Sequence, residues 1–359
     1  MTSESRDPLA TFLSTAREQQ VFSAAAWSVG TVDGTASRGL LGTRAWGGDP
    51  VDAETIWDLA SLTKPIVGLV VMALLERGRL ALTDPIALHL PVYADTDKAD
   101  ITIWHLLTHT SGIPGGQRLY RDHTDPTSLL RAVRQLPLRA APGTQVEYSS
   151  QGFMILGLIA EAASGQTLDA LVRRYVAEPV GMPRLMYNPP EEVRPLAAAT
   201  EECGWRGRLI QGTVHDENAE VLGGVAAHAG LFATLDDIER LGLALLREGQ
   251  GEHGRLLAPR TLAVMTRPAT DHLDPLDHRR SLAWQGADIL GTVPGDLLTA
   301  AAYGHAGFTG TSLWVDPTLG FYAVLLTNRV HPRRDSTAMQ WVRPRFHNLA
   351  VTSVLERRG

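Results

Sequence analysis

The side chains best placed to do chemistry together are those of Ser61 and Lys64, in the segment Trp57-Asp58-Leu59-Ala60-Ser61-Leu62-Thr63-Lys64-Pro65. Residues at positions i and i+3 share one face of a helix, so a helix beginning here would bring the lysine amine to the serine hydroxyl. A serine beside an amine is a nucleophile that needs no histidine. The alternative is a capping serine and a surface lysine. That alternative fits poorly, because the apolar run over residues 65–75 is too hydrophobic to be exposed.

The surroundings of Ser61 favour a negative charge on its oxygen. A helix N-terminus offers free backbone N–H groups and the positive end of the helix dipole. Pro65 is tolerated in the first turn, where its missing N–H has no partner to lose. Lysine occurs only at positions 64 and 98 of the chain, so a lysine at this spacing is informative. The segment therefore predicts a serine nucleophile at the start of an apolar helix.

The composition narrows the possible partners. The chain has 359 residues, 44% of them hydrophobic and 20% charged, with a net charge of -6. This balance argues against nucleic-acid binding, which needs a surplus of Lys and Arg. The single cysteine, Cys203, excludes an intrachain disulfide and a cysteine-based metal cluster. The N-terminal residues lack a signal-peptide pattern and no apolar run is long enough to span a bilayer, so we expect a cytoplasmic protein with no membrane partner.

The two ends of the chain are expected to supply the strands. Asp7 and Pro8 begin a helix; the apolar runs 21–29 and 40–46, separated by Asp33-Gly34, then predict a hairpin. Later strands are predicted at 281–284, 303–310, 311–315 and 321–328, before a last helix after residue 335.

The middle of the chain shows helical patterning. Capping residues and apolar periodicity predict helices at 61–77, 103–107, 125–135, 149–163, 167–177, 236–247 and 259–265. Residues 204–230 are rich in glycine and predict a loop.

The order of the elements predicts an α+β fold. The simplest assembly is one antiparallel sheet built from both termini, with a helical lobe inserted. We expect a single domain over residues 15–350. Its discontinuous α/β subdomain would take residues 1–80 and 230–359, and its mainly helical subdomain residues 81–229.

Three separated motifs now carry a family resemblance. Ser-x-x-Lys, a later Tyr-x-Asn and a late Lys-Thr-Gly mark the penicillin-recognising serine enzymes. Ser61-Leu62-Thr63-Lys64 matches the first motif, Tyr148-Ser149-Ser150 resembles the second, and His305-Ala306-Gly307 resembles the third. The stretches 104–112, 214–219 and 228–231 are also similar to family segments. By their order and spacing the chain is identified as a member of the β-lactamase-related superfamily, which includes class C β-lactamases, penicillin-binding proteins and family VIII-type esterases.

The resemblance implies a fold and a set of roles. The fold would be β-lactamase/transpeptidase-like, with an antiparallel sheet flanked by terminal helices and an all-helical subdomain. Ser61 would be acylated, Lys64 and Tyr148 would share the general-base work, and water would hydrolyse the acyl-enzyme. The backbone N–H groups of Ser61 and Phe308 would form the oxyanion hole. No metal or cofactor is implied. Substrate binding would fall to Ser150, His305 and Gly307.

Two departures from the motifs bear on the substrate. His305 stands where the family has a lysine, a permanent cation suited to a substrate carboxylate. Ser150 stands where the family has an asparagine that helps to hold the substrate amide. Both changes favour hydrolysis of a small carboxylic ester or amide. The alternatives are a β-lactamase or D-alanyl-D-alanine carboxypeptidase, with a β-lactam-like or peptide substrate, and a non-catalytic penicillin-binding-like sensor.

Other histidines and glycines predict no separate chemistry. His105 and His109 have the i, i+4 spacing of zinc ligands, but the glutamate of the metalloprotease motif is absent between them, so we interpret both as structural. The family resemblance implies that His215 and His228 are pocket-wall or loop-ordering residues. The chain has no Gly-x-Ser-x-Gly motif, which argues against an α/β-hydrolase.

Overall fold

The centre of the molecule is a six-stranded antiparallel sheet built from both ends of the chain. The computed structural model describes residues 7–273, 279–287 and 293–357. The strands run in the order β2 (Gly34–Gly42), β1 (Ala24–Thr31), β11 (Phe321–Thr327), β10 (Ser312–Asp316), β9 (Tyr303–Ala306) and β8 (Gln285–Gly286). Strand β1 joins the N-terminal hairpin to β11, with Ala25 opposite Thr327. The predicted assembly of one sheet from both termini is confirmed.

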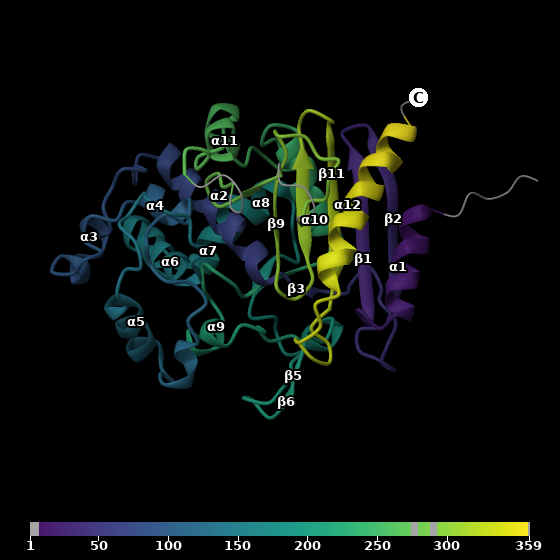
Figure 1. Cartoon of the computed structure of the whole chain (residues 1–359), viewed down its shortest axis with the longest axis horizontal. Coiled ribbons are helices and arrows are strands. Elements are labelled where there is room, and N and C mark those ends of the chain that lie inside the picture. Colours follow the sequence, from purple (N-terminus) through teal and green to yellow (C-terminus); the bar gives the residue numbers. More distant parts are fainter. Residues whose placement is uncertain (1–6, 274–278, 288–292, 358–359) are drawn as a thin grey trace, which may run out of the picture.

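Helices cover both faces of this sheet. Helices α1 (Pro8–Glu18) and α12 (Met339–Glu356) lie together on one face, and α10 (Leu235–Leu246) packs against the other (Figure 1). Successive side chains of a strand point to opposite faces. Accordingly, Phe321 and Leu325 join the core beneath α1 and α12, whereas Val324 and Leu326 join the core on the α10 side. Burial on both faces explains why β1 and β11 are almost continuously apolar.

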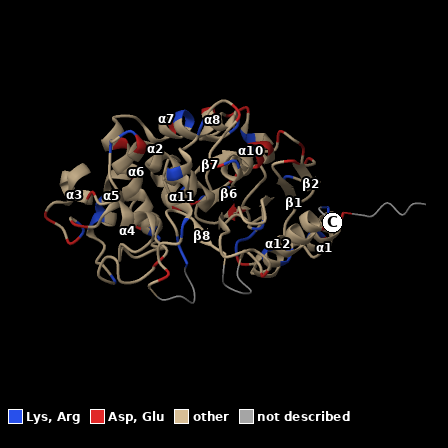
Figure 2. Cartoon of the chain, turned by 90° about the horizontal axis from the view of Figure 1, so that it is seen from above, with Lys and Arg blue, Asp and Glu red and all other residues tan. Residues whose placement is uncertain are grey.

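A helical lobe lies beside the sheet. Its central helix, α2 (Thr63–Glu76), is buried from Thr63 to Leu74 and packs against α6 (Ser150–Ser164). The lobe also contains α3 (Ile86–His89), α4 (Ile103–Leu107), α5 (Pro126–Gln135), α7 (Leu168–Val172), the π-turn Arg173–Ala177, α8 (Glu178–Val180) and α11 (Pro259–Thr266). Figure 2 shows acidic and basic residues interspersed along the ribbon of both parts.

Short elements connect the two parts. Strands β3 (Trp57–Asp58), β7 (Leu231–Ala233) and β4 (Met186–Tyr187) form a three-stranded sheet, and β5 (Glu202–Cys203) pairs with β6 (Arg208–Leu209) in a hairpin. Strand β3 leads directly to Ser61, and its pairing with β7 brings the chain around residue 228 close to that serine.

The helices with clear capping signals are confirmed. The Asp125 side chain accepts a hydrogen bond from Ser128 N at 2.9 Å and caps α5, and Gly165, at φ 71°, ends α6. The α+β fold class is confirmed as well. The subdomain boundaries stay a prediction.

Three local expectations were wrong or incomplete. The second strand of the hairpin begins at Gly34, directly after the turn, rather than at residue 40. The predicted strand at 281–284 is absent, because Ala283 adopts φ 67° and its N–H donates to Leu107 O in the helical lobe at 2.8 Å. The predicted loop at 204–230 contains the short helix α9 (Glu217–Val221), which is capped by Asp216.

Among the described residues, no single helix has the length and apolar character needed to cross a membrane. The segments Ser150–Ser164 and Leu168–Val180 have this length and apolar character only when taken together, and they are bent by 80° relative to each other.

Candidate active site

Ser61 and Lys64 lie together where β3 enters α2. Ser61 sits in the 3-10 turn Ala60–Leu62, which continues directly into the helix. The fully buried Lys64 amine donates to Ser61 Oγ at 3.1 Å and to His228 O at 3.0 Å. Both partners are neutral oxygens, so the amine is aimed at the serine hydroxyl and fixed from behind by a backbone carbonyl.

The backbone before Ser61 is held in an unusual conformation. Ala60 adopts φ 47°, in the left-handed region that non-glycine residues rarely occupy. The buried Asp58 carboxylate accepts hydrogen bonds from Ala60 N at 2.8 Å and from His215 N at 2.7 Å. Burial raises the pKa of Asp58, although both backbone hydrogen bonds oppose this change. Asp58 thus fixes the strained residue that orients the serine.

The tight turn between β9 and β10 carries Phe308 to the same place. Thr309 Oγ1 donates to Asp58 O at 2.7 Å, and Thr311 Oγ1 donates to Leu59 O at 3.0 Å. A Cβ atom at Gly307 would come within 2.4 Å of Leu59 O, so the close approach requires glycine. Gly307 therefore acts by allowing the turn to reach the Ser61 segment.

Two backbone donors remain available at this junction. Within the described part of the chain, neither Ser61 N–H nor Phe308 N–H donates to a protein acceptor. Both residues line one cavity of about 230 Å³. A pair of free N–H groups beside a serine hydroxyl is the arrangement needed to stabilise a tetrahedral oxyanion.

Tyr148 lies beside the lysine amine. Lys64 Nζ is 4.7 Å from the centroid of the half-buried Tyr148 ring. The His109 ring packs on Tyr148 with centroids 4.7 Å apart, and His109 Nδ1 accepts a hydrogen bond from Ser149 N at 3.1 Å. Ser149 in turn caps α6, so the start of this helix and His109 together position Tyr148.

Arg280 is a site residue that the sequence analysis missed. Its side chain is 7% exposed, and its guanidinium carbon lies 5.4 Å from the Tyr148 ring centroid. No described carboxylate pairs with it, and its Nε is buried without a partner among the described residues. Burial lowers the pKa of Arg280, and the nearby Tyr148 opposes that shift. The only signal in the sequence was an arginine directly before the apolar run at 281–284.

His305 is buried and neutral. Burial, followed by the charges of Arg280 and Lys64, lowers its pKa well below the usual range. Its Nδ1 lies 2.9 Å from Ala306 O, and its ring centroid is 5.9 Å from that of Tyr148. His305 is therefore an uncharged neighbour of Tyr148, and Arg280 brings a positive charge beside the same ring.

Polar residues form most of the remaining cavity wall. Ser150 lines the cavity with Ser61, and the remaining polar lining comes from Gln117, Arg118, Gln151, His215, Asp216, Glu217, Asn218 and Arg334. The Phe308 side chain is 46% exposed here, with the His215 ring stacked against it at 5.7 Å and Arg329 over it at 4.3 Å.

Comparison with known proteins places this arrangement in a family. The Beta-lactamase family profile matches residues 11–343. The chain belongs to the Beta-lactamase family of serine hydrolases. It is 31% identical to the N-acetylmuramyl-L-alanine amidase of Bacillus subtilis, over 77% of this chain and 69% of that protein. It is also 31% identical to a putative D-alanyl-D-alanine carboxypeptidase of Escherichia coli, over 79% and 71%.

The fold agrees with this assignment. The solved structure of EstCE1, described as a hydrolase with promiscuous acyltransferase activity, aligns with a TM-score of 0.75. The alignment covers 96% of this chain and 97% of that one at 19% identity. The β-lactamase/transpeptidase-like fold predicted from the motifs is therefore confirmed.

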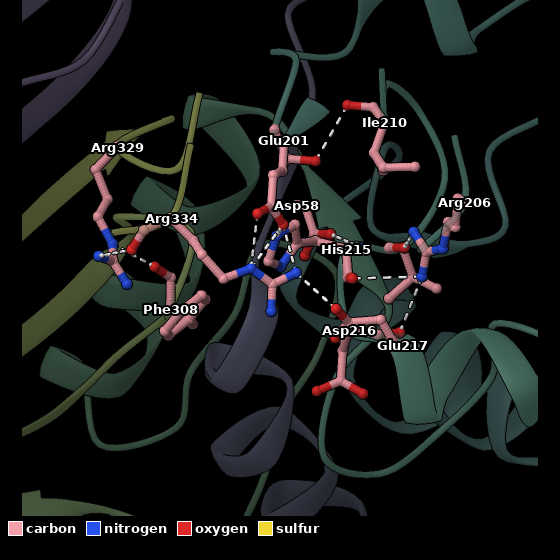
Figure 3. Close-up of polar contacts among 12 residues, drawn as sticks. Asp58, Glu201, Arg206, Ile210, His215, Asp216, Glu217, Phe308, Arg329 and Arg334 are labelled. Carbon is pink, nitrogen blue, oxygen red and sulfur yellow. Dashed lines mark hydrogen bonds and ion pairs between the residues drawn. The ribbon is translucent and has the colours of Figure 1, made fainter. Parts of the chain in front are cut away.

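An ion-pair network closes one wall of the cavity in this Beta-lactamase-family chain (Figure 3). The Arg334 guanidinium donates to Glu201 at 2.7 and 2.8 Å and to Glu217 at 2.6 Å, and His215 Nε2 lies 2.9 Å from Glu201. Burial alone would raise the pKa of Glu201, but the hydrogen bonds from His215 and Arg334 lower it to about 2. Glu201, Cys203 and Glu217 form the one group of three adjacent potential metal ligands among the described residues, and Arg334 occupies both carboxylates.

The remaining histidines order loops. His105 Nδ1 accepts a hydrogen bond from Thr102 N at 3.1 Å in the cap of α4, whereas His109 supports Tyr148, so the two rings serve different segments. His228 presents its carbonyl to Lys64, and its Nε2 lies 3.0 Å from Asp216. Burial would raise the pKa of Asp216, but the charge and hydrogen bond of His228 hold it well below its usual range.

Proposed function

We propose that this chain hydrolyses a carboxylic ester or amide through an acyl-enzyme on Ser61. The observation that carries the proposal is the buried Lys64 amine, 3.1 Å from Ser61 Oγ, beside two backbone N–H groups that have no acceptor among the described residues. This combination supplies a nucleophile and an oxyanion hole in one cavity, with a base in contact with the nucleophile.

The reaction follows from the geometry. Ser61 Oγ attacks the substrate carbonyl carbon while its proton passes to Lys64 Nζ. The carbonyl oxygen becomes an oxyanion held by the N–H groups of Ser61 and Phe308. Collapse of this intermediate breaks the ester or amide bond. The leaving group takes up the proton held by Lys64, and Tyr148 is the neighbouring group that can assist this transfer. Water then attacks the acyl-serine by the same route, which releases the acid and restores Ser61.

A second candidate substrate class has a specific observation in its favour. Arg280 is a buried cation without an ion-pair partner among the described residues and lies against Tyr148, so the loss of the family lysine at position 305 does not leave the surroundings of Tyr148 without positive charge. A substrate carboxylate would pair with such a cation. This favours peptide substrates ending in a carboxylate, as expected of a D-alanyl-D-alanine carboxypeptidase, over a neutral ester.

The test combines intact-mass spectrometry with substrate turnover. After exposure to a fluorophosphonate, the wild-type chain should gain one probe mass and Ser61→Ala none. The matched control Ser164→Ala, at the end of α6, should be labelled like the wild type. Labelling of Ser61→Ala at the wild-type rate would overturn the proposal.

Turnover then separates the alternatives. Hydrolysis of p-nitrophenyl butyrate without D-alanine release supports the ester assignment, and release of D-alanine from a D-Ala-D-Ala peptide supports the second candidate. Rapid nitrocefin hydrolysis would identify a β-lactamase. A stable penicillin adduct on Ser61 with no turnover of any substrate would identify a sensor.

A further inference from the structure

The peptide that carries the second oxyanion donor has a cation at its other end. Phe308 N–H belongs to the Gly307–Phe308 peptide, whose carbonyl is Gly307 O. That oxygen accepts hydrogen bonds from Gly310 N at 3.1 Å and from Arg343 Nη2. Arg343 Nη2 also donates to Thr311 O at 3.2 Å. Arg343 comes from helix α12, on the sheet side of the turn and outside the substrate cavity.

The charge of Arg343 has no acidic partner in the part of the chain that the structure describes. No carboxylate within the described residues forms an ion pair with it, and its buried Nε has no partner there. Burial, and then the neighbouring charge of Arg329, lower its pKa to about 9. The side chain is only half-buried overall, but its Nε is enclosed, and the hydrogen bonds to carbonyl oxygens hold the guanidinium in place.

Arg329 reinforces the same turn from another strand end. Its Nε donates to Phe308 O at 2.7 Å, and its remaining hydrogen bonds go to the carbonyls of Arg334 and Ser336. The carbonyls on both sides of Phe308 therefore accept from guanidinium groups. Positive charge from Arg343 and Arg329 thus lies next to the peptides of Phe308, a residue that lines the same cavity as Ser61.

We propose that Arg343 is a positioning residue of the oxyanion hole, which orients and polarises the Gly307–Phe308 peptide for the developing negative charge. A peptide whose carbonyl accepts from a cation is a stronger N–H donor, because hydrogen bonds in a chain polarise one another. The cation also favours the oxyanion over the neutral carbonyl of the substrate, so its effect falls on the transition state. This inference rests on the proposed function of Ser61.

A purely structural role makes a different prediction. If Arg343 only tied α12 to the turn, its loss would lower stability and the active fraction, without changing the kinetics of the molecules that stay folded. A role in the oxyanion hole instead lowers kcat and the rate of phosphonylation per folded active site, while KM changes little.

The experiment compares Arg343→Met and Arg343→Lys with the control Arg345→Met, which removes an exposed arginine from the same helix. Active sites are titrated by fluorophosphonate mass labelling, and kcat and KM are measured with p-nitrophenyl butyrate. Removing an oxyanion donor outright costs about 10²–10³-fold in kcat. For Arg343→Met, which leaves the donor but not its backing charge, we expect a loss of about 10-fold with KM within about 3-fold. Arg343→Lys and added guanidinium ion should each restore part of the rate.

The outcomes are distinguishable. Equal kcat per titrated site in Arg343→Met and Arg345→Met would overturn the role of Arg343 and leave the proposed function intact. A rate loss in Arg343→Met that neither lysine nor guanidinium restores would also overturn it. If wild-type Ser61 is not labelled at all, the proposed function fails, and this inference falls with it.

Discussion

Replacing Lys64 by methionine is the perturbation that most directly tests the chemistry of the cleft. Methionine keeps the length and apolar stem of lysine but has no amine. In the structure the amine contacts Ser61 Oγ at 3.1 Å and His228 O at 3.0 Å, and its side chain is fully buried. The substitution therefore removes the proposed base without emptying the space around it.

Two opposing contributions decide the effect on stability. The His228 carbonyl loses a buried hydrogen bond, which costs about 1–3 kcal/mol. Removing the amine also relieves the cost of burying a polar group, because both of its partners are neutral oxygens. We therefore expect the unfolding free energy to stay within about 2 kcal/mol of the wild type. The loss of a general base should lower kcat by about 10²–10⁴-fold.

The assay is p-nitrophenyl butyrate hydrolysis per folded molecule, with thermal unfolding measured on the same samples. The matched control is Lys98→Met, because Lys98 is the only other lysine of the chain. It is also buried, at 1% exposure, and pairs with Asp97 at 2.6 Å. If Lys64→Met keeps more than about a tenth of the wild-type kcat, the assignment of Lys64 as the base is wrong. If Lys98→Met is equally inactive, the loss comes from the fold.

Two further predictions use other buried groups. Arg280→Met should lower kcat/KM for a carboxylate-bearing p-nitrophenyl ester about 10–100-fold relative to a neutral ester, because a hydrogen bond to a charged group contributes about 1.5–3 kcal/mol. The control is Arg279→Met, which removes a neighbouring arginine paired with Asp271 and should leave this ratio unchanged. Burial lowers the pKa of His347 to about 3. Between about pH 6.5 and pH 3 this histidine is therefore protonated in the unfolded chain but neutral in the folded chain. The free energy of unfolding should consequently fall as the pH drops through this range. In urea titrations, His347→Gln should reduce the slope of the unfolding free energy against pH by up to about 1.4 kcal/mol per pH unit. The control His272→Gln, which replaces an exposed histidine, should leave the slope unchanged. Equal slopes in the wild type and His347→Gln would contradict the reasoning.

Local features of the fold could be predicted from the sequence because their causes are local. A capping side chain such as Asp125 acts within three residues, and Gly165 ends α6 by its own backbone conformation. The pairing of Ser61 with Lys64 follows from helical spacing in the same way. The motifs then placed Tyr148 and Phe308, and the structure brings both to the neighbourhood of Ser61.

The parts that could not be predicted depend on contacts between distant segments. Residues 281–284 have the composition of a strand, but the hydrogen bond from Ala283 N to Leu107 O, in the other lobe, turns the chain away. The approach of Arg343 to Gly307 O spans 36 residues and depends on the docking of α12 against the sheet. Neither spacing nor periodicity contains this information.

The turn at Ala283 also changes how the motif at His305 should be understood. From the sequence, histidine in place of lysine looked like a loss of charge. In the structure Arg280, which directly precedes residues 281–284, lies against Tyr148, and its charge helps to keep His305 neutral. A lysine at position 305 would place a second buried cation beside Arg280, and like charges in a low-dielectric site repel strongly. The neutral residue at 305 and the arginine at 280 are therefore linked by electrostatics, and the positive charge beside Tyr148 comes from Arg280 rather than from position 305.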